Sequence, residues 1–197
     1  MNNWPDYRKA TNMAYEVSAK MDPFRISADI FKIIDSYSNI AIHSYTEIAA
    51  KFNMSLEEFV DSFSSEYGFT ISNHTGNYEI WYNDTLDTTR VRFTLAHELG
   101  HILLGHEKDD EVSRKEASCF ARNLLIPTPV IDELGIETVH DIASVFDVSA
   151  QMAEVSANYL ASDKYYIQED LYSNLKERAA MYIYGYSPMD FLGNPYI

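Results

Sequence analysis

Residues 90–105, RVRFTLAHELGHILLG, form the stretch of sequence on which the fold prediction depends. Apolar side chains occupy nearly every side of a helix drawn through this stretch, which predicts a helix that is largely buried. A polar residue at 87–89 (Asp, Thr, Thr) can cap its first turn, and Gly105 can end it. We therefore expect a buried helix from about Arg90 to Leu104.

Two histidines lie one helical turn apart in this stretch, within the pentad HELGH at 97–101. This spacing puts both imidazoles on one face of the helix, at a separation that a single zinc ion can bridge. Glu98 borders that face, where a carboxylate can take a proton from water and pass it to the leaving amine while the metal polarises the scissile carbonyl. The pentad therefore predicts zinc on His97 and His101, with Glu98 as the catalytic base of a peptidase.

Catalytic zinc normally has three protein ligands, so a third must lie elsewhere in the chain. Glu116 is our choice because it falls in the first turns of the next helix, on the edge of an apolar stripe, although a surface glutamate is the common alternative. The acidic run 109–111 and Cys119 are weaker candidates, because solvation and core packing explain them more simply. His106 would lie on the opposite side from His97 if the helix continued, so we exclude it as a ligand.

Two segments of the chain together resemble the signature of the ImmA/IrrE metallopeptidase family. They are RVRFTLAHELGHILLGH (90–106) and EASCFARNLLIP (116–127), which match R-x-R-F-T-x-A-H-E-x-G-H and a later E-x-x-x-F-A-x-x-L-L-x-P. The resemblance implies zinc on His97, His101 and Glu116, with Glu98 as the catalytic base. It also implies a substrate class, namely a helix-turn-helix transcriptional repressor of a phage, a mobile element or a stress response.

The remaining pattern predicts an α+β fold, mainly helical, with a small, largely antiparallel three-stranded sheet that flanks the active-site helix. Strands are expected at 39–45, 68–72 and 78–83, the last as an edge strand that pairs with an extended substrate. Further helices are expected at about 6–20, 27–36, 112–125, 138–146, 149–161 and 169–182. We assign residues 1–161 to the metallopeptidase domain, with its core at about 39–160, and residues 162–197 to a tyrosine-rich extension of unknown role.

The composition indicates which classes of partner the protein can bind. Fifteen basic against thirty acidic residues give a formal charge of −15, which repels nucleic acid and anionic membranes. The opening MNNWPDYRKA lacks the apolar segment of a secretory leader, and the single cysteine suits a reducing compartment. We expect a cytoplasmic protein that acts on a protein partner without contacting nucleic acid or membrane; the oligomeric state is not predicted.

Two segments, 47–55 and 141–149, each resemble the first helix and turn of a helix-turn-helix unit. In a helix-turn-helix unit, the helix that follows each segment would be the recognition helix. Both of these helices carry acidic or amide side chains at positions where contacts with phosphate need cations. We interpret both segments as packed helical hairpins.

One alternative function and one residue assignment stay open. The chain could be a non-cleaving, metal-stabilised interaction module, such as an anti-repressor or a toxin-antitoxin partner, but such a module would not need the carboxylate of Glu98. An oxyanion-stabilising residue cannot be chosen from the sequence. Its candidates are His140, Tyr82, Tyr159, Tyr165 and Tyr166.

Overall fold

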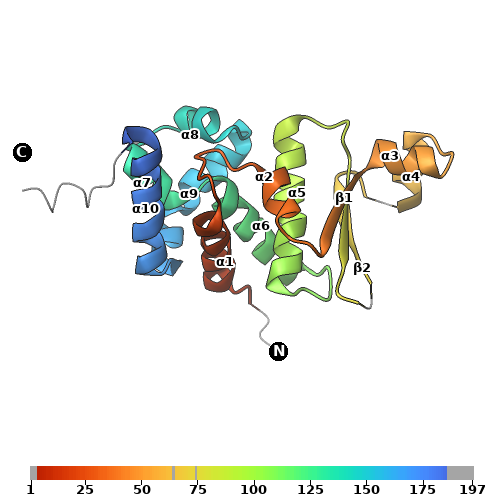
Figure 1. Ribbon diagram of the computed structural model, residues 1–197, viewed down its shortest axis with the longest axis horizontal. Coiled ribbons are helices and arrows are strands. Elements are labelled where there is room, and N and C mark those ends of the chain that lie inside the picture. Colours follow the sequence, from red (N-terminus) through yellow and green to blue (C-terminus); the bar gives the residue numbers. More distant parts are fainter. Residues whose placement is uncertain (1–3, 64, 74, 186–197) are drawn as a thin grey trace, which may run out of the picture.

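The computed structural model describes residues 4–63, 65–73 and 75–185 and confirms a mainly helical α+β fold (Figure 1). The first half of the chain contains α1 (Tyr7–Lys20), α2 (Ile30–Asp35), β1 (Ile40–Ser44), α3 (Tyr45–Lys51), α4 (Leu56–Phe63), β2 (Gly68–Ser72) and β3 (Tyr78–Tyr82). The second half contains α5 (Thr88–Leu104), α6 (Glu111–Leu125), α7 (Thr128–Leu134), α8 (Val139–Phe146), α9 (Ala150–Tyr166) and α10 (Glu169–Tyr184). None of the helices in these ranges is long and apolar enough to cross a membrane.

The sheet has the strand order β1-β3-β2, with β1 parallel and β2 antiparallel to β3. It is therefore mixed rather than largely antiparallel. The prediction that 78–83 is an edge strand is wrong, because β3 is central and β2 is the edge on one side. Alternation of apolar and polar residues indicates a strand but not its neighbours, and here α3 and α4 intervene between β1 and β2.

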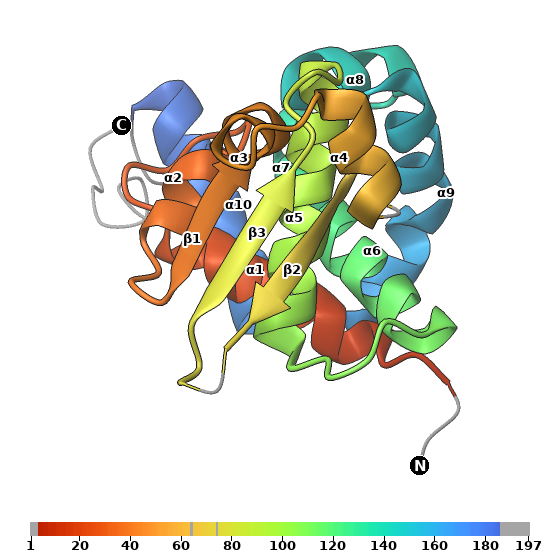
Figure 2. The ribbon, with the colours of Figure 1, turned by 90° about the vertical axis from the view of Figure 1, so that its right-hand side faces the viewer.

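Helix α5 lies between the sheet and a layer of other helices, which includes α1 and α6 (Figures 1 and 2). Leu95, Ala96 and Leu99 of α5 are fully buried. Asp87 caps the first turn by accepting a hydrogen bond from the Arg90 amide, and Gly105 ends the helix in the left-handed conformation. The predicted buried helix and both of its end signals are therefore confirmed.

Gly100 allows α5 and α6 to approach closely. A Cβ at this position would lie 2.9 Å from the Phe120 ring and 3.2 Å from the backbone of Ala117. The contacted atoms of Ala117 are backbone atoms of α6, so they cannot move aside as the end of a flexible side chain could. Gly100 thus sets the distance at which α6 presents its side chains to the pentad.

We expect Gly100→Val to lower the free energy of unfolding by about 2–3 kcal/mol, because overpacking would push α6 away from α5. Urea denaturation followed by circular dichroism measures this change. An unchanged unfolding midpoint would mean that α5 and α6 can move apart without lowering the free energy of unfolding.

Helix α7 is not among the helices expected from the sequence, because prolines at 127 and 129 favour the end of a helix over the start of another. In the structure Pro127 is the N-cap and Pro129 lies in the first turn of α7, where a missing amide hydrogen costs nothing.

The expected domain boundary at 161/162 falls inside α9. Helix α10 packs against α7 and α1, with Leu175, Ala179 and Ala180 buried. Residues 186–197 of the predicted extension lie outside the described residues.

The two segments that resemble helix-turn-helix units each bury part of their apolar side chains within the protein, although Phe52 and Val145 are exposed. Ile48 and Ala49 of the first segment join Tyr45, Phe59 and Trp81 in a small separate cluster. Ile142 and Phe146 of α8 join the main core. Both segments are thus packed hairpins, as interpreted from the sequence.

Candidate metal centre

His97 and His101 bring their ring nitrogens together on one face of α5. The two Nε2 atoms are 3.1 Å apart. A tetrahedral zinc ion with bonds of about 2.0–2.1 Å would hold two ligand atoms about 3.4 Å apart. The pair therefore fits a shared metal ion without rearrangement of the helix.

The surroundings keep both imidazoles neutral. Burial lowers the pKa of His97 to about 4, and the neighbouring His101 adds to this effect. Burial also lowers the pKa of His101, with His106 as the next cause. A neutral imidazole has a nitrogen lone pair for a metal, so protons compete little for this pair near neutral pH.

Ser118 supports His97 from α6. Its hydroxyl lies 3.3 Å from Nδ1 of His97, the ring nitrogen on the side away from His101. A partner at this second nitrogen fixes the ring orientation of a metal-binding histidine. Nothing in the sequence singled out Ser118, because the contact depends on how α6 packs on α5.

Glu98 is held by the edge strand of the sheet. The hydroxyl of Thr70, on β2, donates a 2.8 Å hydrogen bond to Oε2 of Glu98. Burial raises the pKa of Glu98, and the bond from Thr70 opposes that rise. Thr70 was not predicted as a site residue, because the alternating pattern of a strand does not show which helix residue each of its side chains faces.

Glu116 lies beside the histidines, but its carboxylate contacts other groups. Oε1 accepts a 2.6 Å hydrogen bond from the backbone amide of Asp6, and Oε2 lies 2.8 Å from Nε2 of His106. Across the described ranges, no three His, Cys, Asp or Glu side chains lie together in an arrangement that would hold a metal. As a third ligand, Glu116 would exchange these two partners for the ion.

His106 does not face away from the site, so that prediction is wrong. The helix ends at Leu104, and Gly105 in the left-handed conformation turns the chain back. Nδ1 of His106 then lies 3.1 Å from Nδ1 of His101, while its Nε2 contacts Glu116. His106 would face away only if the helix continued past Gly105.

We expect His106→Ala to weaken zinc binding about 10- to 100-fold, the usual cost of losing a partner that orients metal ligands. His140→Ala, which removes an exposed histidine on α8, is the matched control. Competition with a chromophoric chelator measures both affinities. Equal affinities for the two variants would show that His106 does not support the ligands, and complete loss of zinc would make it a ligand itself.

The weaker ligand candidates have other roles. Asp109 and Glu111 form exposed ion pairs with Arg114 and Lys115, respectively. Asp110 caps α6 by accepting a hydrogen bond from the Ser113 amide. The sulfur of the buried Cys119 lies 3.5 Å from the hydroxyl of Thr11 on α1.

None of the candidate oxyanion donors forms a hydrogen bond with Glu98 or the histidines within the described part of the chain. Tyr82 packs edge-on against Phe31, and His140 is exposed. Tyr159 lies over Arg122, while Tyr165 and Tyr166 contact each other.

One protein-family model matches this chain. It is described as Peptidase_M78, IrrE N-terminal-like domain, and it matches residues 61–158. This range contains Thr70, the pentad and Glu116, and it ends within α9. No curated protein matches the chain.

Proposed function

The chain belongs, through residues 61–158, to the ImmA/IrrE family of metallopeptidases, and on this premise we propose that it is a zinc-dependent endopeptidase that cuts a specific protein. One observation carries the proposal. The Nε2 atoms of His97 and His101 converge at 3.1 Å, and Thr70 holds the Glu98 carboxylate beside them. This pairing of two neutral imidazoles with a buried carboxylate suits hydrolysis of a peptide bond.

In this proposal His97 and His101 hold zinc through Nε2, and Glu116 supplies the third ligand. Zinc bound there would polarise the scissile carbonyl and make a water molecule easier to deprotonate. Ser118 orients His97, and His106 connects Glu116 to His101.

Glu98 moves the proton. Its carboxylate accepts a proton from the attacking water and delivers it to the leaving amine. Burial raises the pKa of Glu98, which makes it a stronger base than an exposed glutamate. The hydrogen bond from Thr70 engages one oxygen, Oε2, and so leaves Oε1 for the proton.

Strand β2 is the edge along which an extended substrate can pair. Its partner β3 covers one side only, and no described strand pairs with the other. A segment added along this edge would pass close to Glu98, because Thr70 of β2 contacts that carboxylate. This replaces the expectation that 78–83 binds the substrate.

The substrate that we propose is a helix-turn-helix repressor of a phage, a mobile element or a stress response, cut in the cytoplasm. The family resemblance supplies this class. The formal charge of −15 supports a protein substrate over direct binding of DNA by this chain.

Comparison of protein N-termini in cells that express either the wild type or Glu98→Gln tests the proposal. Mass spectrometry is expected to find new N-termini at one or a few sites in a DNA-binding protein, in wild-type cells alone. If both cell types give the same N-termini, the proposed function is wrong.

One observation favours the alternative, a metal-stabilised module that binds a partner without cutting it. The carboxylate of Glu116 contacts His106 and Asp6 instead of pointing at the two converging imidazoles. This alternative predicts that the wild type co-purifies with an intact partner when zinc is present.

A further inference from the structure

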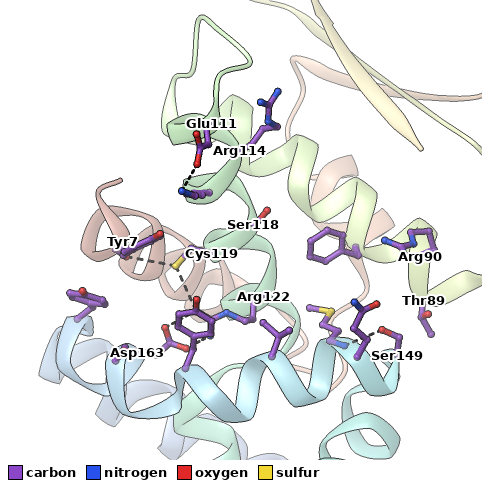
Figure 3. Close-up of a pocket in the computed structure, with 18 of the residues that line it drawn as sticks. Tyr7, Thr89, Arg90, Glu111, Arg114, Ser118, Cys119, Arg122, Ser149 and Asp163 are labelled. Atoms are coloured by element: carbon purple, nitrogen blue, oxygen red, sulfur yellow. Dashed lines mark hydrogen bonds and ion pairs between the residues drawn. The ribbon is translucent and has the colours of Figure 1, made fainter. Parts of the chain in front are cut away.

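A cavity of about 820 Å³ opens between α1, α5, α6 and α9 (Figure 3). It adjoins the candidate metal centre through two of its lining residues. Ser118 lies 3.3 Å from Nδ1 of His97, and the Phe93 ring lies 5.9 Å from the His97 ring, centre to centre. His97 itself does not line the cavity, so a group bound there would lie behind the His97 ring, on the side of Nδ1 rather than of the metal-facing Nε2.

Part of the cavity wall is apolar. Phe93 of α5 and Met152, Val155 and Tyr159 of α9 line it. Val155 and Tyr159 are 42% and 49% exposed, although both are large hydrophobic residues. Cavities of this size and character usually bury most of an apolar ligand.

The floor of the cavity carries no unpaired charge. The guanidinium of Arg122 binds both oxygens of the buried Asp163, with Nη2 to Oδ1 at 2.8 Å. Tyr159 covers the same guanidinium at 4.8 Å. An uncharged side chain therefore fits at this depth, because a charged one would be desolvated without a partner.

The rim at the beginning of α5 is different, because Arg90 is exposed there. Arg90 lies over the Tyr67 ring. The pKa of Asp87 is lowered first by the hydrogen bond from Thr89 and also by the charge of Arg90, so Asp87 lies within electrostatic reach of this guanidinium. Three of the four cations in the lining already have carboxylate partners: Arg114 pairs with Asp109, Lys115 with Glu111 and Arg122 with Asp163. Arg90 forms no such ion pair among the described residues, so an acidic group of a partner fits beside it.

We propose that the cavity binds large apolar side chains of the polypeptide substrate behind His97, with an acidic substrate residue at Arg90. This inference rests on the proposed function, because it says which substrate side chains the proposed endopeptidase binds. The position behind His97, the apolar part of the wall, the paired charges of the floor and the exposed guanidinium of Arg90 match this occupant.

A binding experiment tests the assignment without requiring cleavage. The probe is a fluorescently labelled peptide with Leu-Phe at its centre and Asp on either side. One comparison peptide has Ala-Ala at the centre, and another has Lys in place of Asp. Binding is measured with zinc-loaded Glu98→Gln protein, so that no peptide is cut.

Two further substitutions are added to that protein, each with an expected result. Val155→Glu should weaken binding of the Leu-Phe peptide more than about tenfold, because it puts a charge into the apolar wall. Arg90→Glu should reverse the preference, so that the Lys peptide binds more tightly than the Asp peptide. Val145→Glu is the matched control, because Val145 on α8 is 37% exposed but does not line the cavity. Zinc content and thermal midpoint are measured for every variant.

The inference is overturned if the three peptides bind equally, or if Val155→Glu binds as tightly as Val145→Glu. It is also overturned if anilinonaphthalene sulfonate, a small apolar anion, binds in the cavity and the Leu-Phe peptide does not displace it. Cleavage by the protein with Glu98 intact is measured separately. Specific peptide binding without any cleavage would refute the proposed function but not the assignment of the cavity. Cleavage that Val155→Glu does not affect would refute the assignment of the cavity but not the proposed function.

Discussion

Replacing Glu98 by Gln is expected to slow peptide hydrolysis by about 10²- to 10⁴-fold and to leave zinc bound. Glutamine keeps the size of the side chain and can still contact Thr70, but it cannot accept the proton of the attacking water. The rate of cleavage of the identified substrate, with zinc content measured on the same samples, gives the result.

Thr70→Val is a useful companion to this variant. It removes the hydroxyl that holds Oε2 of Glu98 and keeps the proton acceptor, so we expect a smaller loss, about tenfold. A Glu98→Gln protein as active as the wild type would refute the role of this carboxylate.

Glu116→Ala is expected to weaken zinc binding on the order of a thousandfold, because it removes one of three proposed ligands. It would also leave His106 without its carboxylate partner and Asp6 without its hydrogen-bond acceptor. Titration of zinc in competition with a chelator of known affinity measures the change.

Glu111→Ala is the matched control for this experiment. It removes a glutamate from the same helix, one that pairs with Lys115 at the surface. If Glu116→Ala and Glu111→Ala bind zinc equally well, Glu116 is not a ligand, and the third ligand must come from elsewhere in the chain.

Local signals in the sequence were sufficient to predict the active-site helix. Asp87 begins the helix and Gly105 ends it, and the apolar run between them determines its burial. Each signal lies in or next to the part of the helix that it determines. The same holds for the converging imidazoles, because a spacing of four residues on a helix fixes their relative position.

Features that depend on distant segments were missed or predicted wrongly. Thr70 reaches Glu98 only because β2 is an edge strand over α5, and strand order is not encoded in the alternation of side chains. Ser118 meets His97 because Gly100 lets α6 approach closely. His106 was misplaced because a single left-handed residue changes the direction of the chain.

We propose above all that His97 and His101 hold a zinc ion. Zinc is titrated into metal-free wild-type protein and into a variant with both His97→Ala and His101→Ala. We expect one zinc per wild-type chain, bound with a dissociation constant of about a micromolar or tighter, and none in the double variant. Wild-type protein that binds no zinc, or a double variant that binds it equally well, would show that these histidines do not hold the metal.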